Sequence, residues 1–160
     1  MKDFVKIDAK AVLETCARIE GTVAKVYRVL AGAHVSSPML VGLWRKTADD
    51  EDSHERQIRF VIDNYDETKN VILVVPGRAE TGLKAAEAVL AAIDKNMPAP
   101  VPALKMALEL EELFKVFHAE NATLHTDPTL KTLFATLKTG DDHHIGALKT
   151  ALAGLEKGAN

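Results

Sequence analysis

The sequence predicts an all-α fold, an antiparallel bundle of four long helices arranged as two helical hairpins. Apolar residues recur at steps of three and four over four stretches, residues 8–33, 38–63, 102–124 and 128–156. A short connector within each pair of stretches requires the two flanking helices to lie side by side in opposite directions. With 160 residues, of which 47% are hydrophobic, we expect one domain with one core.

Two helix starts are marked by a capping side chain followed by proline. Ser37 precedes Pro38, and Asp127 precedes Pro128. A serine or aspartate side chain accepts a hydrogen bond from a free backbone N–H of the first turn, and proline suits the first helical position because its missing N–H is not needed there. We therefore expect the second helix of each hairpin to begin at its proline.

The segment between the hairpins, about residues 66–101, predicts a long crossover. Its apolar run, Val71–Val75, has the composition of a short strand. A lone strand has no partner for its backbone, so we expect an extended segment that packs against the bundle. The alanine-rich stretch around residues 79–95 predicts an additional helix within the crossover.

An internal repeat relates the two hairpins. A shift of 90 residues aligns a proline cap, a core aromatic residue and a carboxylate–histidine pair, and a shift of 91 aligns two residues of the preceding helix. The matched pairs are Pro38 with Pro128, Trp44 with Phe134, Glu51 with Asp141, His54 with His144, Glu20 with Glu111, and Tyr27 with His118. The repeat predicts a pseudo-twofold arrangement of the hairpins, with Trp44 and Phe134 as core anchors.

The repeat also predicts a buried site for two metal ions. Residues three apart in an α-helix differ by about 60° around the axis and about 4.5 Å along it, so each carboxylate–histidine pair shares one face. A glutamate from each facing helix completes the pattern of ferritin-like di-iron and di-manganese proteins. Four carboxylates nearly balance two divalent ions, and oxygen with imidazole suits iron or manganese. The expected ligands are Glu20, Glu51, His54, Glu111, Asp141 and His144.

Some of these assignments have alternatives in the sequence. Glu51 and His54 lie in a polar segment, residues 49–56, which is also typical of a solvated helix face. On the third helix, Glu112 is the alternative to Glu111 as the metal ligand. We favour metal ligation by Glu51, His54 and Glu111 because the internal repeat supports it.

Tyr27 and His118 each lie seven residues beyond a predicted glutamate ligand. Seven residues are two helical turns, so both side chains share the face of the ligands. We expect them to hydrogen-bond ligand carboxylates. The alternative for Tyr27 is that it packs at the end of the bundle.

Four segments together carry a family resemblance. The first places alanine and tyrosine four and seven residues after a glutamate, and the second and fourth each contain a carboxylate–histidine pair. The segments are Glu20–Tyr27, Leu43–His54, Ala107–Glu112 and Asp141–His144. They resemble the rubrerythrin branch of the ferritin-like superfamily, and the resemblance covers most of the chain outside the crossover. It implies a non-haem di-iron site that reacts with peroxide or dioxygen, or that oxidises ferrous iron.

The sequence departs from the rubrerythrin pattern at two positions. Phe114 lies three residues after Glu111, where the family has an added glutamate used in redox-linked ligand exchange, so the resemblance supports the di-iron site more strongly than peroxide reduction. Asp141 stands where the family has glutamate. Its neighbour Gly140 leaves open a helix break capped by Asp141, because glycine within a helix costs about 1 kcal/mol. The resemblance does not extend to the family's rubredoxin domain, so we expect another protein to donate electrons.

These observations support three functional hypotheses. The first is an oxidoreductase or ferroxidase that holds two iron ions, with manganese or zinc as other metals, and acts on peroxide, dioxygen or ferrous iron. The second is an iron-storage oligomer, and the third is a helical bundle with a remnant metal site. For all three we expect a homodimer or a larger homo-oligomer.

Composition excludes several other classes of protein. The net charge is −3 with no basic stripe, which argues against nucleic acid as a partner. No apolar run reaches the roughly 18 residues of a membrane span, and the first residues lack the apolar stretch of a signal peptide, so we expect a cytoplasmic protein. Cys16 is the single cysteine, so we expect a small buried hydrophobe and no disulfide.

Overall fold

The computed structural model of the chain describes residues 5–66, 71–75 and 77–158, which form five helices and two short strands. The elements are β1 Val5–Asp8, α1 Ala9–Ala33, α2 Pro38–Asn64, β2 Val71–Val74, α3 Arg78–Lys95, α4 Pro100–Leu124 and α5 Pro128–Gly158. The predicted all-α class is confirmed, and α3 is the additional helix expected in the crossover. Within these ranges no helix is both long and apolar enough to cross a membrane.

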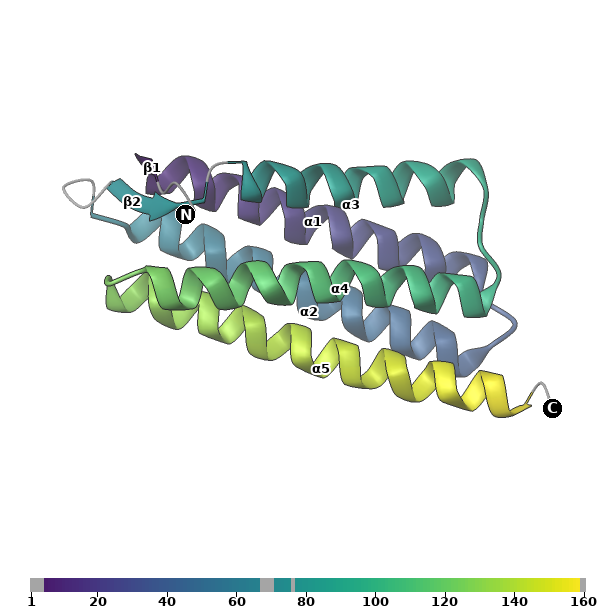
Figure 1. The fold of residues 1–160 in the computed structure, drawn as a ribbon. Coiled ribbons are helices and arrows are strands. Elements are labelled where there is room, and N and C mark those ends of the chain that lie inside the picture. The colour runs from purple at the N-terminus through teal and green to yellow at the C-terminus, as the bar shows by residue number, and fades with distance from the viewer. Residues whose placement is uncertain (1–4, 67–70, 76, 159–160) are drawn as a thin grey trace.

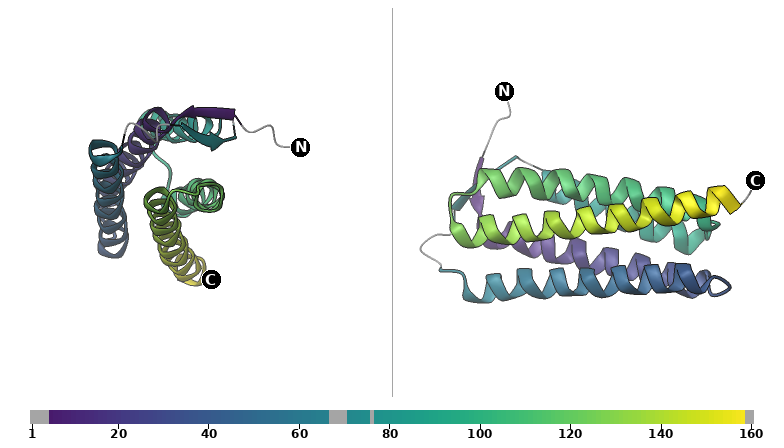
Figure 2. Two further views of the ribbon diagram at one scale, coloured as in Figure 1. Left: turned by 90° about the vertical axis from the view of Figure 1, so that its left-hand side faces the viewer. Right: turned by 90° about the horizontal axis from the view of Figure 1, so that it is seen from below.

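The long helices lie along one common direction in two pairs. Helices α1 and α2 form one antiparallel pair, and α4 and α5 form the other (Figure 1). Seen end-on, the pairs lie next to each other, and α3 runs beside α1 (Figure 2). This arrangement turns one face of each long helix toward the centre of the molecule.

The predicted helix starts at the two prolines are confirmed. The Ser37 hydroxyl accepts a hydrogen bond from the backbone N–H of Leu40 at 3.4 Å. Asp127 Oδ1 accepts two, from the N–H groups of Thr129 at 2.9 Å and Leu130 at 3.1 Å. Both caps satisfy backbone donors that have no partner within the helix.

The expectation for the apolar run in the crossover was wrong. β2 pairs with β1 in an antiparallel two-stranded sheet, with Val5 opposite Val74 and Asp8 opposite Val71. Residues just before the first helix thus supply the partner that the run needs for its backbone groups. Asp8 has a second role, because its carboxylate accepts a hydrogen bond from the N–H of Lys10 at 2.9 Å and caps α1.

Helix α5 continues without a break through Gly140. The alternative in which Asp141 caps a late fourth helix is therefore wrong. A Cβ atom at Gly140 would lie 2.4 Å from Cε1 of His54, closer than real contacts allow. Glycine at this position lets α5 approach the His54 ring of α2 closely.

The hydrophobic core consists of two clusters with a layer of buried carboxylates and histidines between them. We call this the polar layer, and it contains Glu20, Glu51, His54, Glu111, His118, Asp141 and His144. One cluster includes Trp44 and Leu104, and the other includes Leu13 and Phe134. Along α2 and α5, the residues of the polar layer fall between positions that belong to the two clusters. Cys16 is fully buried as expected, and burial raises the pKa of its thiol well above the usual range. The apolar clusters shield the polar layer from water on both sides.

Candidate metal centre

All six predicted ligands are buried in the polar layer. They come from four helices: Glu20 from α1, Glu51 and His54 from α2, Glu111 from α4, and Asp141 and His144 from α5. The exposed fraction of each is 7% or less. The alternative of a solvated helix face at Glu51 and His54 is therefore wrong. Charged side chains are rarely buried to this extent unless they are paired or bind metal.

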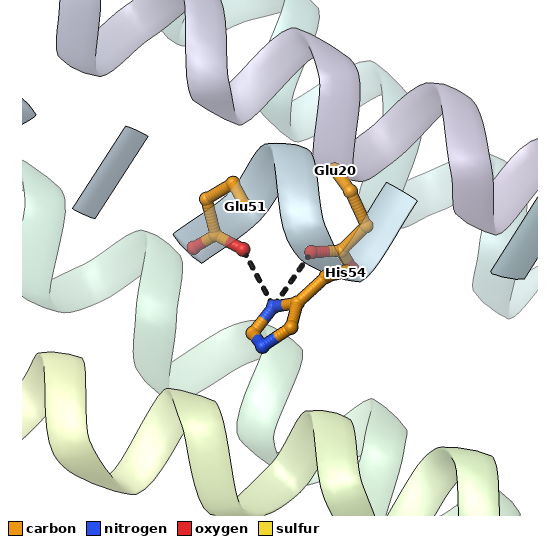
Figure 3. A group of neighbouring side chains, drawn as sticks. All are labelled: Glu20, Glu51 and His54. Atoms are coloured by element: carbon orange, nitrogen blue, oxygen red, sulfur yellow. Dashed lines mark hydrogen bonds and ion pairs between the residues drawn. The ribbon is translucent and has the colours of Figure 1, made fainter. Parts of the chain in front are cut away.

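One group of possible ligands joins α1 and α2. Nδ1 of His54 lies 2.9 Å from Oε2 of Glu51 and 3.4 Å from Oε2 of Glu20 (Figure 3). One potential ligand atom from each of the three side chains lies within 4.8 Å of the others. A metal ion between these atoms would replace the proton that now joins them. We call this group the His54 position.

A second group joins α2, α4 and α5, and we call it the His144 position. Nδ1 of His144 lies 3.0 Å from Oε1 of Glu51 and 3.4 Å from Oε2 of Glu111. These three side chains also offer ligand atoms within 4.8 Å of one another. Glu51 belongs to both positions, with one carboxylate oxygen near His54 and the other near His144. Its carboxylate could therefore offer one oxygen to each position.

Asp141 is the predicted ligand that the structure does not bring into either position. Its Oδ2 atom lies 2.7 Å from Nδ1 of His118. The other nitrogen of His118, Nε2, lies 3.4 Å from Oε1 of Glu20. His118 thus contacts two carboxylates of the layer, as expected for a residue that orients ligands.

Tyr27 hydrogen-bonds a carboxylate of the layer, as the sequence predicted. Its hydroxyl donates to Oε1 of Glu111, and its side chain is fully buried and stacked on Trp44 with ring centroids 5.7 Å apart. The alternative at the end of the bundle is therefore wrong. The alternative ligand Glu112 is excluded from the layer, because its side chain is 47% exposed and pairs with Lys149 at 3.3 Å.

In the metal-free protein, several side chains of the polar layer have raised pKa values and so retain protons. Burial, together with the charges of Glu111 and Glu20, raises the pKa of Glu51 to about 8. Burial by itself would lower the pKa of His54, but hydrogen bonds to Glu20 and Glu51 raise it to about 10. Hydrogen bonds to Glu111 and Glu51 likewise outweigh burial at His144 and raise its pKa to about 11. The carboxylates therefore favour positive charge between them.

Glu20 shows the clearest need for a further cation. Burial opposes its ionisation, yet hydrogen bonds from His118 and His54 hold its pKa well below the usual range. Its Oε1 atom is buried, and its 3.4 Å contact with Nε2 of His118 does not have good hydrogen-bond geometry. A buried charged oxygen without a well-formed hydrogen bond is costly, so the carboxylate of Glu20 favours a cation nearby.

Asp50 is a neighbour of the site that was not among the residues predicted from the sequence. Its Oδ2 lies 3.4 Å from Nε2 of His144 and 2.6 Å from Nζ of Lys46. It borders a surface groove of about 460 Å³ between α2 and α5 that is also lined by His54 and His144. Its position directly before Glu51 was a signal that could have drawn attention to it. The groove connects the two histidines with the surface.

Comparison of the chain with protein-family models, curated proteins and solved structures finds no match. The chain's own residues form a buried layer in which glutamate and histidine side chains could hold metal ions at two adjoining positions.

Proposed function

We propose that the chain is a ferritin-like four-helix protein of the rubrerythrin type that binds two iron ions and acts as an oxidoreductase or ferroxidase. The observation that carries this proposal is the position of Glu51, whose two oxygens face two different histidines across a buried layer. Shared carboxylates of this kind are typical of two-metal sites. Carboxylate and imidazole donors without thiolates favour iron or manganese.

The ligand side chains of the proposed centre belong to two metal positions. Glu20 and His54 would hold one ion, Glu111 and His144 would hold the other, and Glu51 would contribute to both. Nδ1 of each histidine faces its carboxylates, so Nδ1 is the ligand atom. Two iron ions, when bound, supply two electrons, which with two protons convert hydrogen peroxide to two water molecules.

The surrounding residues prepare the site for this chemistry. Tyr27 orients Glu111 by its hydrogen bond, and His118 contacts Glu20 and Asp141. Hydrogen bonds of this type raise metal affinity and fix ligand orientation. The two apolar clusters exclude bulk water, and the groove between α2 and α5 gives a small oxidant or ferrous iron access to the layer.

Metal content tests the proposal directly. The full chain, purified without chelators and loaded anaerobically with ferrous iron, is expected to hold about two iron ions per chain, as measured by elemental analysis. Glu51→Gln is expected to lose both ions because Glu51 belongs to both positions. Glu109→Gln is the matched control, since Glu109 is exposed on α4, two residues before Glu111. Circular dichroism verifies that each variant is folded.

Reactivity then separates the proposal from its alternatives. Dioxygen or peroxide added to the ferrous protein should oxidise the bound iron faster than it oxidises free iron in the same buffer. A folded wild-type chain that binds no iron contradicts the proposal, and bound iron that does not react indicates a remnant site. A closed shell of many copies in light scattering would favour iron storage.

A further inference from the structure

The internal repeat is broken at the residue that precedes each predicted bridging carboxylate. The shift of 90 residues places Asp50, before Glu51, on Gly140, before Asp141. In the structure these two equivalent positions face the two histidines of the centre. Asp50 lies against His144, and Gly140 lies against His54. One histidine therefore has a carboxylate beside it where the other has only backbone.

The contact to Asp50 involves the outer nitrogen of His144. Nδ1 of this ring faces Glu51 and Glu111, while Nε2 lies 3.4 Å from Oδ2 of Asp50. The Asp50 carboxylate is itself held by Lys46 at 2.6 Å. A carboxylate on the outer nitrogen fixes the ring, selects the tautomer that leaves Nδ1 free for metal, and increases its basicity.

His54 lacks this support. A Cβ atom at Gly140 would lie 2.5 Å from Nε2 of His54, so the ring fills the space that a side chain would occupy. Glycine provides no side-chain oxygen to accept a proton from Nε2. Like the His144 ring, the His54 ring lines the groove between α2 and α5, but without a carboxylate on its outer nitrogen.

We propose that the two metal positions are unequal, and that Asp50 is the positioning residue that makes the His144 position the tighter one. The first ion binds at Glu51, Glu111 and His144. The second ion binds more weakly at Glu20, Glu51 and His54 and therefore exchanges more readily. This inference rests on the proposed two-metal function and adds an order of filling to it.

Titration of the metal-free full chain with zinc, a redox-inactive probe, tests the inequality. Calorimetry should show two steps whose dissociation constants differ by about 10-fold to 100-fold, the usual effect of such a supporting carboxylate. Asp50→Asn is expected to raise the dissociation constant of the first step by a similar factor, so that the two steps have similar affinities. Asp49→Asn is the matched control, because Asp49 is the adjacent residue on α2 and its side chain is 80% exposed.

A second variant addresses the weaker position. Gly140→Ala places a methyl group against the His54 ring, so it should remove the second step and keep the first. Gly146→Ala is its control on the same helix, since a Cβ atom at Gly146 meets no other atom within 4 Å. Anomalous scattering from crystals grown with one equivalent of zinc should show the ion at the His144 position.

The outcomes distinguish the inference from the function on which it rests. Two equal zinc steps, a first ion at His54, or an Asp50→Asn variant that binds like Asp49→Asn would overturn the inference and leave the two-metal function standing. A folded wild-type chain that binds no zinc and no ferrous iron would overturn both.

Discussion

The hydroxyl of Tyr27 on α1 donates a hydrogen bond to Glu111 on α4, and both side chains are fully buried. Its counterpart in the repeat, His118 on α4, contacts Glu20 on α1 at 3.4 Å. One side chain of each hairpin thus contacts the predicted glutamate ligand, Glu111 or Glu20, of the other hairpin. The two contacts join the hairpins through the candidate centre as well as through the apolar clusters.

The Tyr27→Phe variant tests the first of these contacts. It leaves the stacking on Trp44 in place but removes the only hydroxyl that the structure places on Glu111. Loss of a donor to a buried carboxylate should lower the free energy of unfolding of the metal-free protein by about 1–3 kcal/mol. Urea denaturation measures this change. A Tyr27→Phe variant that is as stable as the wild type would contradict the prediction.

The metal-free protein should lose stability as the pH rises above neutrality. The pKa of His54 is about 10 and that of His144 about 11 in the folded protein, both above the ordinary value of 6.5. A raised pKa stabilises the folded state fully below the unfolded value, and this contribution disappears as the pH rises through the folded value. The pKa of Glu51 is raised from 4.5 to about 8, so its ionisation also lowers the free energy of unfolding as the pH rises between these two values.

Urea denaturation at a series of pH values measures this dependence. The free energy of unfolding should fall steadily between about pH 6.5 and pH 10. His144→Gln should reduce the slope, whereas His143→Gln, a change at the exposed neighbouring residue, should retain it. A free energy of unfolding that is constant or rises over this range would contradict the assignment of protons to the layer.

Metal binding should release protons from the same groups. At neutral pH the raised pKa values leave His54, His144 and Glu51 protonated, and each must lose its proton before it can bind metal. Zinc affinity should therefore increase with pH. Calorimetry in buffers of different ionisation enthalpy should detect about three protons released when both positions fill at pH 7. Release of no protons would show that the metal binds elsewhere.

Local chemistry explains which features could be predicted from the sequence. The helix starts at Pro38 and Pro128 depend on the adjacent residues, and the shared face of Glu51 and His54 depends on helical spacing alone. Both are properties of a short segment, so they are visible without the fold. The repeat extended this reasoning to the opposite hairpin.

Features that depend on contacts between distant segments could not be predicted in the same way. The pairing of β1 with β2 required knowledge that Val5–Asp8 lies beside Val71–Val74. The contact between Asp50 and His144 depends on how closely α2 and α5 approach. Helical spacing does not contain that distance. It also did not predict that the shorter Asp141 side chain would pair with His118.

His34 was assigned no role from the sequence, but it connects three parts of the chain. Nδ1 of His34 accepts a hydrogen bond from Nε1 of Trp44 at 3.0 Å, and Nε2 donates to the carbonyl oxygen of Pro98 at 3.0 Å. The ring thereby ties the end of α1 to α2 and to the segment before α4. Because Trp44 and His34 are buried, these bonds are protected from water.

The His34→Ala variant should weaken the scaffold without altering the metal centre. It leaves the buried indole N–H of Trp44 without its acceptor, which should cost about 1–3 kcal/mol of unfolding free energy. The number of zinc ions bound should remain that of the wild type, since His34 is in neither metal position. Loss of zinc binding in a folded His34→Ala protein would contradict this separation of roles.

Asp141 pairs with His118 at 2.7 Å and lies outside both metal positions. If this pairing persists when metal binds, Asp141→Asn should retain both zinc steps with a modest loss of affinity, whereas Glu51→Gln should lose them. Asp141→Glu adds one methylene and gives the carboxylate a longer reach within the layer. It should tighten zinc binding, at a packing cost of about 1–3 kcal/mol in the metal-free protein. Calorimetry with zinc and urea denaturation without it measure the two effects separately. Complete loss of a zinc step in folded Asp141→Asn would show instead that Asp141 leaves His118 and becomes a ligand, as the repeat first predicted.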